Sequence, residues 1–359
     1  MKIDYSVRNY DYLKRDGNLQ VEAQGKVKSK KYFPYFFEGK TKKIFKPLSK
    51  SKPFSTPYFA YSEVVWSHIL HTFFDGNIPL YHLAICKGYE EEVPKYHNYG
   101  TIVDSIIDSG EHLVNIYEYF MKYPDEHVTP EIYDYVNYCL YFYDYTFFFK
   151  SELLKNNYEL ASEIARQILY SILRGDQNYH YENVSFIFKG NNLDRVAMPI
   201  DHEFSSFFMY LDQEIPHNGL VRRYFFEMGE QQNEEEKFIR SLLGFNEKKS
   251  PIINNIEVIT SLYPDVVEKF LASLDVMIES QGQEPITLEN HDYLGAFSSE
   301  DYEVGILRYK ENNLEAAAKR ASKIVKRDVS VWEVNEKLNQ EILKSATYLK
   351  KTLENKMMK

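Results

Sequence analysis

Short apolar runs between turn residues characterise the amino-terminal part of the chain. They predict strands at Leu19–Ala23, Tyr32–Phe37 and Ile44–Lys46, and we expect Pro47 to end the last of these because proline cannot donate to a strand ladder. Thr101–Val103 fits two interpretations that both remain open. It is either a core strand or the segment that joins two lobes.

Helical spacing dominates from Pro130 onward, where apolar residues recur at steps of three and four. We expect one long aromatic helix over Ile132–Leu153 and a second over Leu160–Leu173, which Gly175 can end in a left-handed conformation. Four later stripes predict further helices at Phe238–Leu243, Ile256–Leu262, Val266–Met277 and Val331–Leu353.

A hairpin interrupts the helical part of the chain. Val184–Phe188 and Val196–Ile200 have the apolar character of two short strands around a polar turn. Because most strands come first and most helices follow, the pattern predicts an α+β protein with two lobes. We expect a small β-rich lobe at residues 1–103, the core of a larger helical lobe at 104–245, and a helical extension at 246–359.

Composition and charge exclude several classes of protein. The 359 residues are 44% hydrophobic, which indicates a packed core rather than disorder. The net charge of −10 argues against nucleic-acid binding through a basic face. The most apolar window, Tyr135–Phe149, is too short and too polar to cross a bilayer, and the amino terminus lacks the apolar core of a signal peptide. With Cys86 and Cys139 each alone in an apolar setting, we expect a cytoplasmic protein without a membrane partner, and the oligomeric state stays open.

Basic residues gather in the first fifty positions, around Gly25 in particular. A glycine followed by Lys26, Lys28 and Ser29 between two predicted strands can let backbone amides approach phosphate groups. From these residues alone, however, an ordinary lysine-rich turn is favoured.

Lys46 and Glu63 form a second candidate for phosphate chemistry. Lys43 and Lys46 are three residues apart, so they point to opposite faces of a strand, and only Lys46 lies in its apolar part. The next apolar stripe predicts a helix that begins near Ser62 and carries Glu63 in its first turn. Glu63 fits either a glutamate favoured by the helix dipole or a partner that holds the Lys46 ammonium at phosphates. The alternative for Lys46 is a surface lysine with a buried stem.

Polar and charged side chains lie on both sides of the predicted hairpin in the sequence. Phosphoryl transfer requires a carboxylate near the attacking hydroxyl, oxygen ligands for Mg²⁺ and a cation on the other phosphates of ATP. Asp176 can serve as the base, and Asn183 and Asp201 can hold the metal. Lys46 can neutralise the α- and β-phosphates. Two more residues of this stretch can steady the loop or the γ-phosphate: Arg174 and His180.

Five segments in this order resemble the HipA-like serine/threonine kinases: IFKP, YSEVVWSHIL, YGTIVDSIIDSGEHLVNIYEYF, the GD…H..EN.SF loop and MPIDHEFSS. The resemblance covers roughly Phe36 to Tyr210 and implies a bilobal protein kinase-like fold that uses ATP and Mg²⁺. It implies Asp176 as the base, Asn183 and Asp201 as metal ligands and Lys46 on ATP. It also implies a protein hydroxyl as acceptor, with autophosphorylation at a loop serine such as Ser29, Ser49, Ser51 or Ser55.

The chain also departs from the kinase pattern. The usual catalytic loop has four residues between its Asp and Asn, whereas six separate Asp176 from Asn183, so Asn178 is the runner-up ligand. No clear glycine-rich loop is present. The longer loop keeps a pseudokinase open as an alternative, and turn residues without chemistry would leave a helical protein-binding domain. A metal hydrolase using His180, Asp201 and His202 is a weaker alternative, because no carboxylate cluster accompanies these residues.

Overall fold

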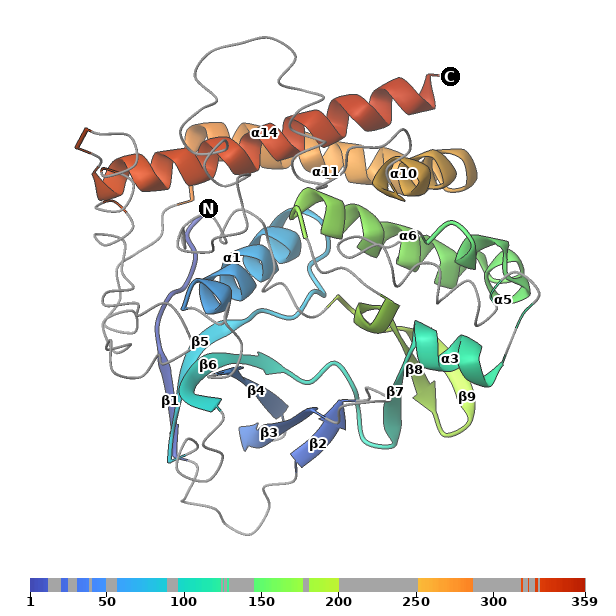
Figure 1. Ribbon diagram of the computed structural model, residues 1–359, viewed down its shortest axis with the longest axis horizontal. Helices are drawn as coiled ribbons and strands as arrows, with labels where there is room; N and C mark the ends of the chain where they lie inside the picture. Colours follow the sequence, from blue (N-terminus) through green and yellow to red (C-terminus); the bar gives the residue numbers. More distant parts are fainter. Residues whose placement is uncertain are drawn as a thin grey trace.

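The structure is a computed structural model. This structure describes residues 1–11, 21–24, 31–38, 41–49, 57–88, 96–123, 125, 128, 145–176, 181–199, 251–286, 318, 322, 327–328 and 330–358. Figure 1 shows a β-rich amino-terminal part, a layer of helices from the carboxy-terminal half, and a small second sheet beside them. This is the α+β, two-lobed arrangement that the sequence predicts.

A six-stranded sheet, in the order β1-β5-β6-β4-β3-β2, forms the amino-terminal lobe. Only β1 runs parallel to its neighbour β5, and the other pairs are antiparallel. The strands are β1 (Arg8–Asp11), β2 (Val21–Gln24), β3 (Lys31–Glu38), β4 (Thr41–Ser49), β5 (His82–Lys87) and β6 (Tyr96–Asp104). Thr101–Val103 lies within β6, hydrogen-bonded between β4 and β5, so it is a core strand and not the segment between lobes.

The prediction that Pro47 ends its strand is wrong. Strand β4 continues to Ser49, with Pro47 opposite Gly100 and a shift of register between Pro47 and Ser49. The two strands approach closely here, because a Cβ added at Gly100 would lie 2.0 Å from the backbone oxygen of Lys46. The irregular pairing accommodates the missing N–H of proline, and the glycine makes room for it.

Helix α1 (Pro57–Phe73) packs against β5 and β6 on one side and against a carboxy-terminal helix on the other. It is buried around its whole circumference from Ala60 to Leu70, as expected for a helix enclosed between two layers. The helix begins five residues before Ser62, with a proline at its start. Glu63 therefore does not lie in the first turn, and the helix dipole does not explain its presence.

Four helices form the main layer of the second lobe (Figure 1): α6 (Tyr158–Leu173), α10 (Pro251–Leu262), α11 (Pro264–Gln283) and α14 (Val331–Met357). All four were predicted by apolar spacing, and their apolar faces meet in the core. Helix α14 contacts α6, α10 and α11, so the end of the chain closes this layer.

The prediction of one continuous helix over Ile132–Leu153 is wrong in the part that is described. The chain instead forms a 3-10 turn, η1 (Phe148–Lys150), and a short helix, α5 (Glu152–Lys155). Ser151 separates them because its backbone is extended and its hydroxyl accepts a hydrogen bond from the Leu154 amide. Upstream, the Tyr145 amide donates to Asn255 Oδ1 at 2.8 Å, a long-range bond that also replaces helical pairing.

The small sheet has the order β7-β8-β9, with β7 (Glu111–Asn115), β8 (Ser185–Lys189) and β9 (Asn192–Val196), and α3 (Ile116–Lys122) follows β7 directly. The predicted second strand, Val196–Ile200, is displaced: the strand begins at Asn192 and ends at Val196. Gly190 has φ 63°, which closes a two-residue turn and lets Lys189 pair with Asn192.

No helix among the described residues is both long enough and apolar enough to cross a membrane.

Candidate functional site

The strand β4 and the helix α1 bring Lys46 and Glu63 together. Lys46 lies opposite Thr101 in the sheet, and its ammonium donates to Glu63 Oε1 in an ion pair. The side chain of Glu63 is 2% exposed and that of Lys46 is 18% exposed. A buried carboxylate needs a cation, so the pair joins the sheet to α1 and leaves the ammonium at the edge of the buried region.

Lys43 points to the other face of β4, as the strand alternation predicts. It donates to Asp104, its register partner on β6, at 2.5 Å. Lys43 and Lys46 therefore have separate carboxylate partners, and that of Lys46 lies on α1.

The end of α6 presents Asp176. Gly175 has φ 60°, as the sequence predicts, and the Asp176 amide donates to the Ser171 carbonyl at 3.0 Å. The carboxylate accepts a hydrogen bond from Arg174 Nη2 at 2.8 Å, and both side chains are almost fully buried. The same guanidinium nitrogen donates to Ser171 Oγ at 3.0 Å, so Arg174 fixes the carboxylate against its own helix.

Helix α14 supports this helix end from outside. Ser345 Oγ donates to the Leu173 carbonyl at 3.0 Å, one of the carbonyls that a helix end leaves without a partner. Sequence analysis missed Ser345, since a single serine on an amphipathic helix carries no visible signal.

Asn183 ends the 3-10 turn η2 (Tyr181–Asn183) just before strand β8, and it is half-buried. The next residue, Val184, is fully buried, and its carbonyl accepts from the Ile116 amide at 2.8 Å. Asn183 is therefore attached to a rigid element, although the residues between Asp176 and Tyr181 lie outside the described residues.

Gln167 positions the exit of the hairpin. Its side-chain amide donates to the Ala197 carbonyl at 2.6 Å, while the Ala197 amide donates to the Ser185 carbonyl at 2.8 Å. Gln167 is 1% exposed, and it lies on the helix face formed by Ile164 and Ile168. A polar residue on an apolar helix face was the signal that sequence analysis could have used.

Six of the predicted site residues lie outside the described residues: Lys26, Lys28, Ser29, Asn178, His180 and Asp201. Their roles stay predictions. The structure thus brings together two pairs of the predicted residues, Lys46 with Glu63 and Arg174 with Asp176, and fixes the position of Asn183.

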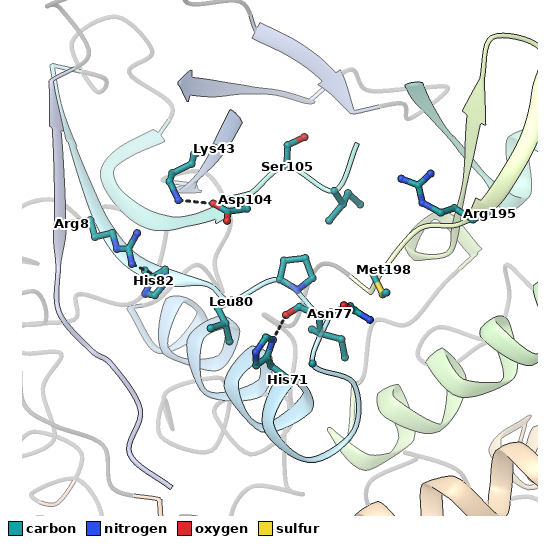
Figure 2. Close-up of a pocket in the computed structure, with 14 residues that line it drawn as sticks. Arg8, Lys43, His71, Asn77, Leu80, His82, Asp104, Ser105, Arg195 and Met198 are labelled. Atoms are coloured by element: carbon teal, nitrogen blue, oxygen red, sulfur yellow. Dashed lines mark hydrogen bonds and ion pairs between the residues drawn. The ribbon is translucent and has the colours of Figure 1, made fainter. Parts of the chain in front are cut away.

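A cavity of about 520 Å³ lies between the first sheet, the turn after α1 and the β8–β9 hairpin. Figure 2 shows Lys43 and Asp104 on one side of it, Arg195 and Met198 on another, and His71 and Asn77 below. None of Lys46, Glu63, Arg174 and Asp176 is among the described residues that line it.

The cationic groups of this cavity are already paired within the protein. Arg195 binds both carboxylate oxygens of Glu111 at 2.9 and 3.0 Å, and this lowers the pKa of Glu111 to about 2. Arg8 donates to His82 at 3.0 Å, and burial together with this guanidinium lowers the pKa of His82 to about 4. His82 is therefore neutral at pH 7, and the cavity is less suited to phosphates than the sum of its basic residues implies.

Comparison of the sequence with protein-family models and with curated proteins gives no match. Among solved structures, the chain is similar to the crystal structure of a Helicobacter pylori proinflammatory kinase, CtkA, with 10% sequence identity, 98% of each chain covered and a TM-score of 0.42. The chain itself has an α+β arrangement, with a β-rich amino-terminal lobe and a second lobe built mainly of helices.

Proposed function

We propose that this protein is an ATP-dependent kinase that transfers the γ-phosphate to a serine or threonine hydroxyl of a protein, its own chain included. The observation that supports the proposal most directly is the ion pair between Lys46 on a strand and Glu63 on the following helix. Protein kinases use a strand lysine held by a helix glutamate to bind the α- and β-phosphates. The buried Glu63 carboxylate directs the Lys46 ammonium to the edge of the buried region, where this arrangement would place it beside phosphates.

The other roles follow from the chemistry of the side chains. Asp176 is the proposed base for the attacking hydroxyl, and Arg174 positions it. The amide oxygen of Asn183 and the carboxylate of Asp201 suit Mg²⁺, which prefers oxygen ligands and would neutralise charge on the phosphates of ATP. Asn178 is the alternative ligand. Lys26, Lys28 and Ser29 are proposed to cover the phosphates, and His180 to steady the catalytic loop.

One observation favours a second candidate function, nucleotide binding without transfer. The Asp176 side chain is 2% exposed and is engaged by Arg174, whereas a general base must reach a substrate hydroxyl. In this second candidate, Lys46 and Glu63 still hold the nucleotide, and the protein acts as a pseudokinase.

Labelling from γ-labelled ATP with Mg²⁺ tests the first proposal. The wild-type protein is expected to label itself or a protein in a lysate of its source cell, with phosphosites identified by mass spectrometry. Asp176→Asn preserves an acceptor for Arg174 but removes the base, so it should abolish labelling in a folded protein. Asp201→Asn should do the same, while Asp194→Asn, an exposed change on β9, should label like the wild type.

Thermal unfolding with and without Mg-ATP separates the candidates. Stabilisation with labelling supports the kinase, and stabilisation without labelling in any lysate supports the pseudokinase. If Mg-ATP neither stabilises the protein nor labels it, both proposals fail and a protein-binding role takes their place. Labelling that persists in Asp176→Asn would show that another residue acts as the base.

A further inference from the structure

A second cavity, of about 570 Å³, lies between the end of α1, the amino-terminal half of α6 and helix α11. Asn77, in the turn after α1, lines both this cavity and the first one. The second cavity does not include the predicted catalytic end of α6: Tyr170 is the α6 residue nearest to that end among those that line the cavity, and Arg174 and Asp176 are not among the described lining residues. The proposed kinase chemistry therefore gives this cavity no role.

The wall of the cavity carries more negative than positive charge. Four carboxylates and two cations are found among the described residues that line it: Asp75, Glu159, Glu163 and Asp265 against Arg166 and Lys269. Arg166 pairs with both Asp75 and Glu163, each at 3.2 Å, so one guanidinium serves two carboxylates. An added positive charge would balance this group.

Two buried polar atoms of the wall make no well-formed hydrogen bond among the described residues, although the Tyr158 hydroxyl lies near Ser162 and the Gln167 side chain lies near Glu163. The two atoms are Oε1 of Glu163 and Oγ of Ser162, whose side chains line the cavity. Ser162 is only 9% exposed, and burial raises the pKa of Glu163 even though Arg166 lies beside its other oxygen. Buried polar atoms without partners are uncommon in native proteins, and a bound donor would satisfy both.

The floor of the cavity is aromatic. The ring of Phe74 lies 5.6 Å from that of Tyr170 and 5.0 Å from that of Phe270, measured between centroids. Such a surface packs against an apolar stem, and aromatic faces also attract cations. A bare metal ion fits less well, because no group of three or more metal-ligating side chains occurs among the described residues.

We propose that this cavity binds a small organic cation, a primary ammonium on an apolar chain of the alkyl-diamine class. The ammonium donates to Glu163 Oε1 and Ser162 Oγ, and the chain lies over Phe74 and Phe270. An ammonium carries three donors and no acceptor. It can therefore donate to Glu163 Oε1 and Ser162 Oγ, and its charge adds to that of Arg166, the single guanidinium shared by Asp75 and Glu163. A lysine side chain of another protein has the same chemistry, so the test must separate the two sources.

Isothermal titration of the full chain with 1,5-diaminopentane tests the proposal without any need for kinase activity. We expect saturable binding that Glu163→Gln weakens at least tenfold, since this change removes the charge but retains an acceptor for Arg166. Ser162→Ala should weaken binding less. Glu268→Gln, an exposed change on α11 outside the cavity, is the matched control and should bind like the wild type.

Two results would overturn the proposal: absence of saturable binding, or equal affinity in the wild type and in a folded Glu163→Gln protein. Nα-acetyl-lysine amide serves as the second probe. Binding of this probe in place of the diamine would reassign the site to a protein lysine and overturn the small-molecule part. Because all these measurements report binding at Glu163, they stand or fall independently of phosphoryl transfer at Asp176.

Discussion

Replacing Lys46 by methionine tests whether its charge, rather than its packing, holds α1 against the sheet. Methionine keeps an apolar stem but removes the ammonium, so the buried carboxylate of Glu63 loses its ion pair with Lys46. Breaking a buried pair in this way costs about 3–5 kcal/mol. Because the Lys46 side chain is 18% exposed, solvent already weakens the pair, and we expect a loss of about 3 kcal/mol at pH 7.

In the Lys46→Met variant, the Glu63 carboxylate can reduce this loss of stability by taking up a proton. For a glutamate with an ordinary pKa, protonation costs about 3.7 kcal/mol at pH 7 but only about 1 kcal/mol at pH 5, since each unit of pH is worth about 1.4 kcal/mol. The destabilisation of Lys46→Met relative to the wild type should therefore shrink to about 1 kcal/mol at pH 5. Loss of packing alone would give a destabilisation that does not change with pH.

Tryptophan fluorescence during urea unfolding can measure both values. Trp66 lies on α1, three residues after Glu63, and is fully buried, while Trp332 is 70% exposed. A Trp332→Phe background therefore isolates a signal from α1. The double variant Lys46→Met/Glu63→Leu should regain most of the lost stability, because an apolar pair can replace a buried ion pair, but it should not regain labelling.

The explanation is refuted if the free energy of unfolding of Lys46→Met at pH 7 lies within about 0.5 kcal/mol of the wild-type value, because a broken buried pair should cost more than this. A double variant as unstable as the single one would refute it as well.

Three other changes give distinct expected results. Gly100→Ala should destabilise the protein by about 3 kcal/mol or more in urea unfolding, because the added Cβ would lie 2.0 Å from a backbone oxygen of β4, whereas Gly76→Ala has open space and should be near neutral. The free energy of unfolding should fall by about 2 kcal/mol when the pH is lowered from 6.5 to 4. His82 takes up a proton over this range in the unfolded chain, but in the folded protein its pKa is lowered to about 4 and it stays largely neutral. His82→Gln should lose this pH dependence. Asn183→Ala should reduce labelling about 100-fold or more, and Asn178→Ala should not; the reverse result would transfer the metal-ligand role to Asn178.

Local periodicity was enough to predict the long helices and their faces. Helices α6 and α14 were predicted almost to their ends, because one apolar stripe per helix decides which face is buried. The pairing of Lys46 with Glu63 was also accessible, since strand alternation and helix order constrain both side chains. The helix break before Ser151 was not, because a bond from Tyr145 to Asn255, far along the chain, helps to determine it.

Positioning residues were the hardest part of the site to predict. Gln167 and Ser345 act on backbone carbonyls of distant segments, and neither belongs to a recognisable motif. The displaced hairpin strand has a different cause. The polar residues Asn192 and Asp194 suggest a loop, yet Gly190 closes a tight turn that makes them part of the strand.

The hydrogen bond from Ser345 to the Leu173 carbonyl joins residues 172 positions apart. During synthesis from the amino terminus, every residue proposed to take part in phosphoryl transfer is made well before this serine. The support for Asp176 is therefore completed only when α14 has been made and has docked. A shortened chain that lacks α14 would contain all the proposed chemical groups without this hydrogen bond, so we expect the proposed activity to require the docking of α14.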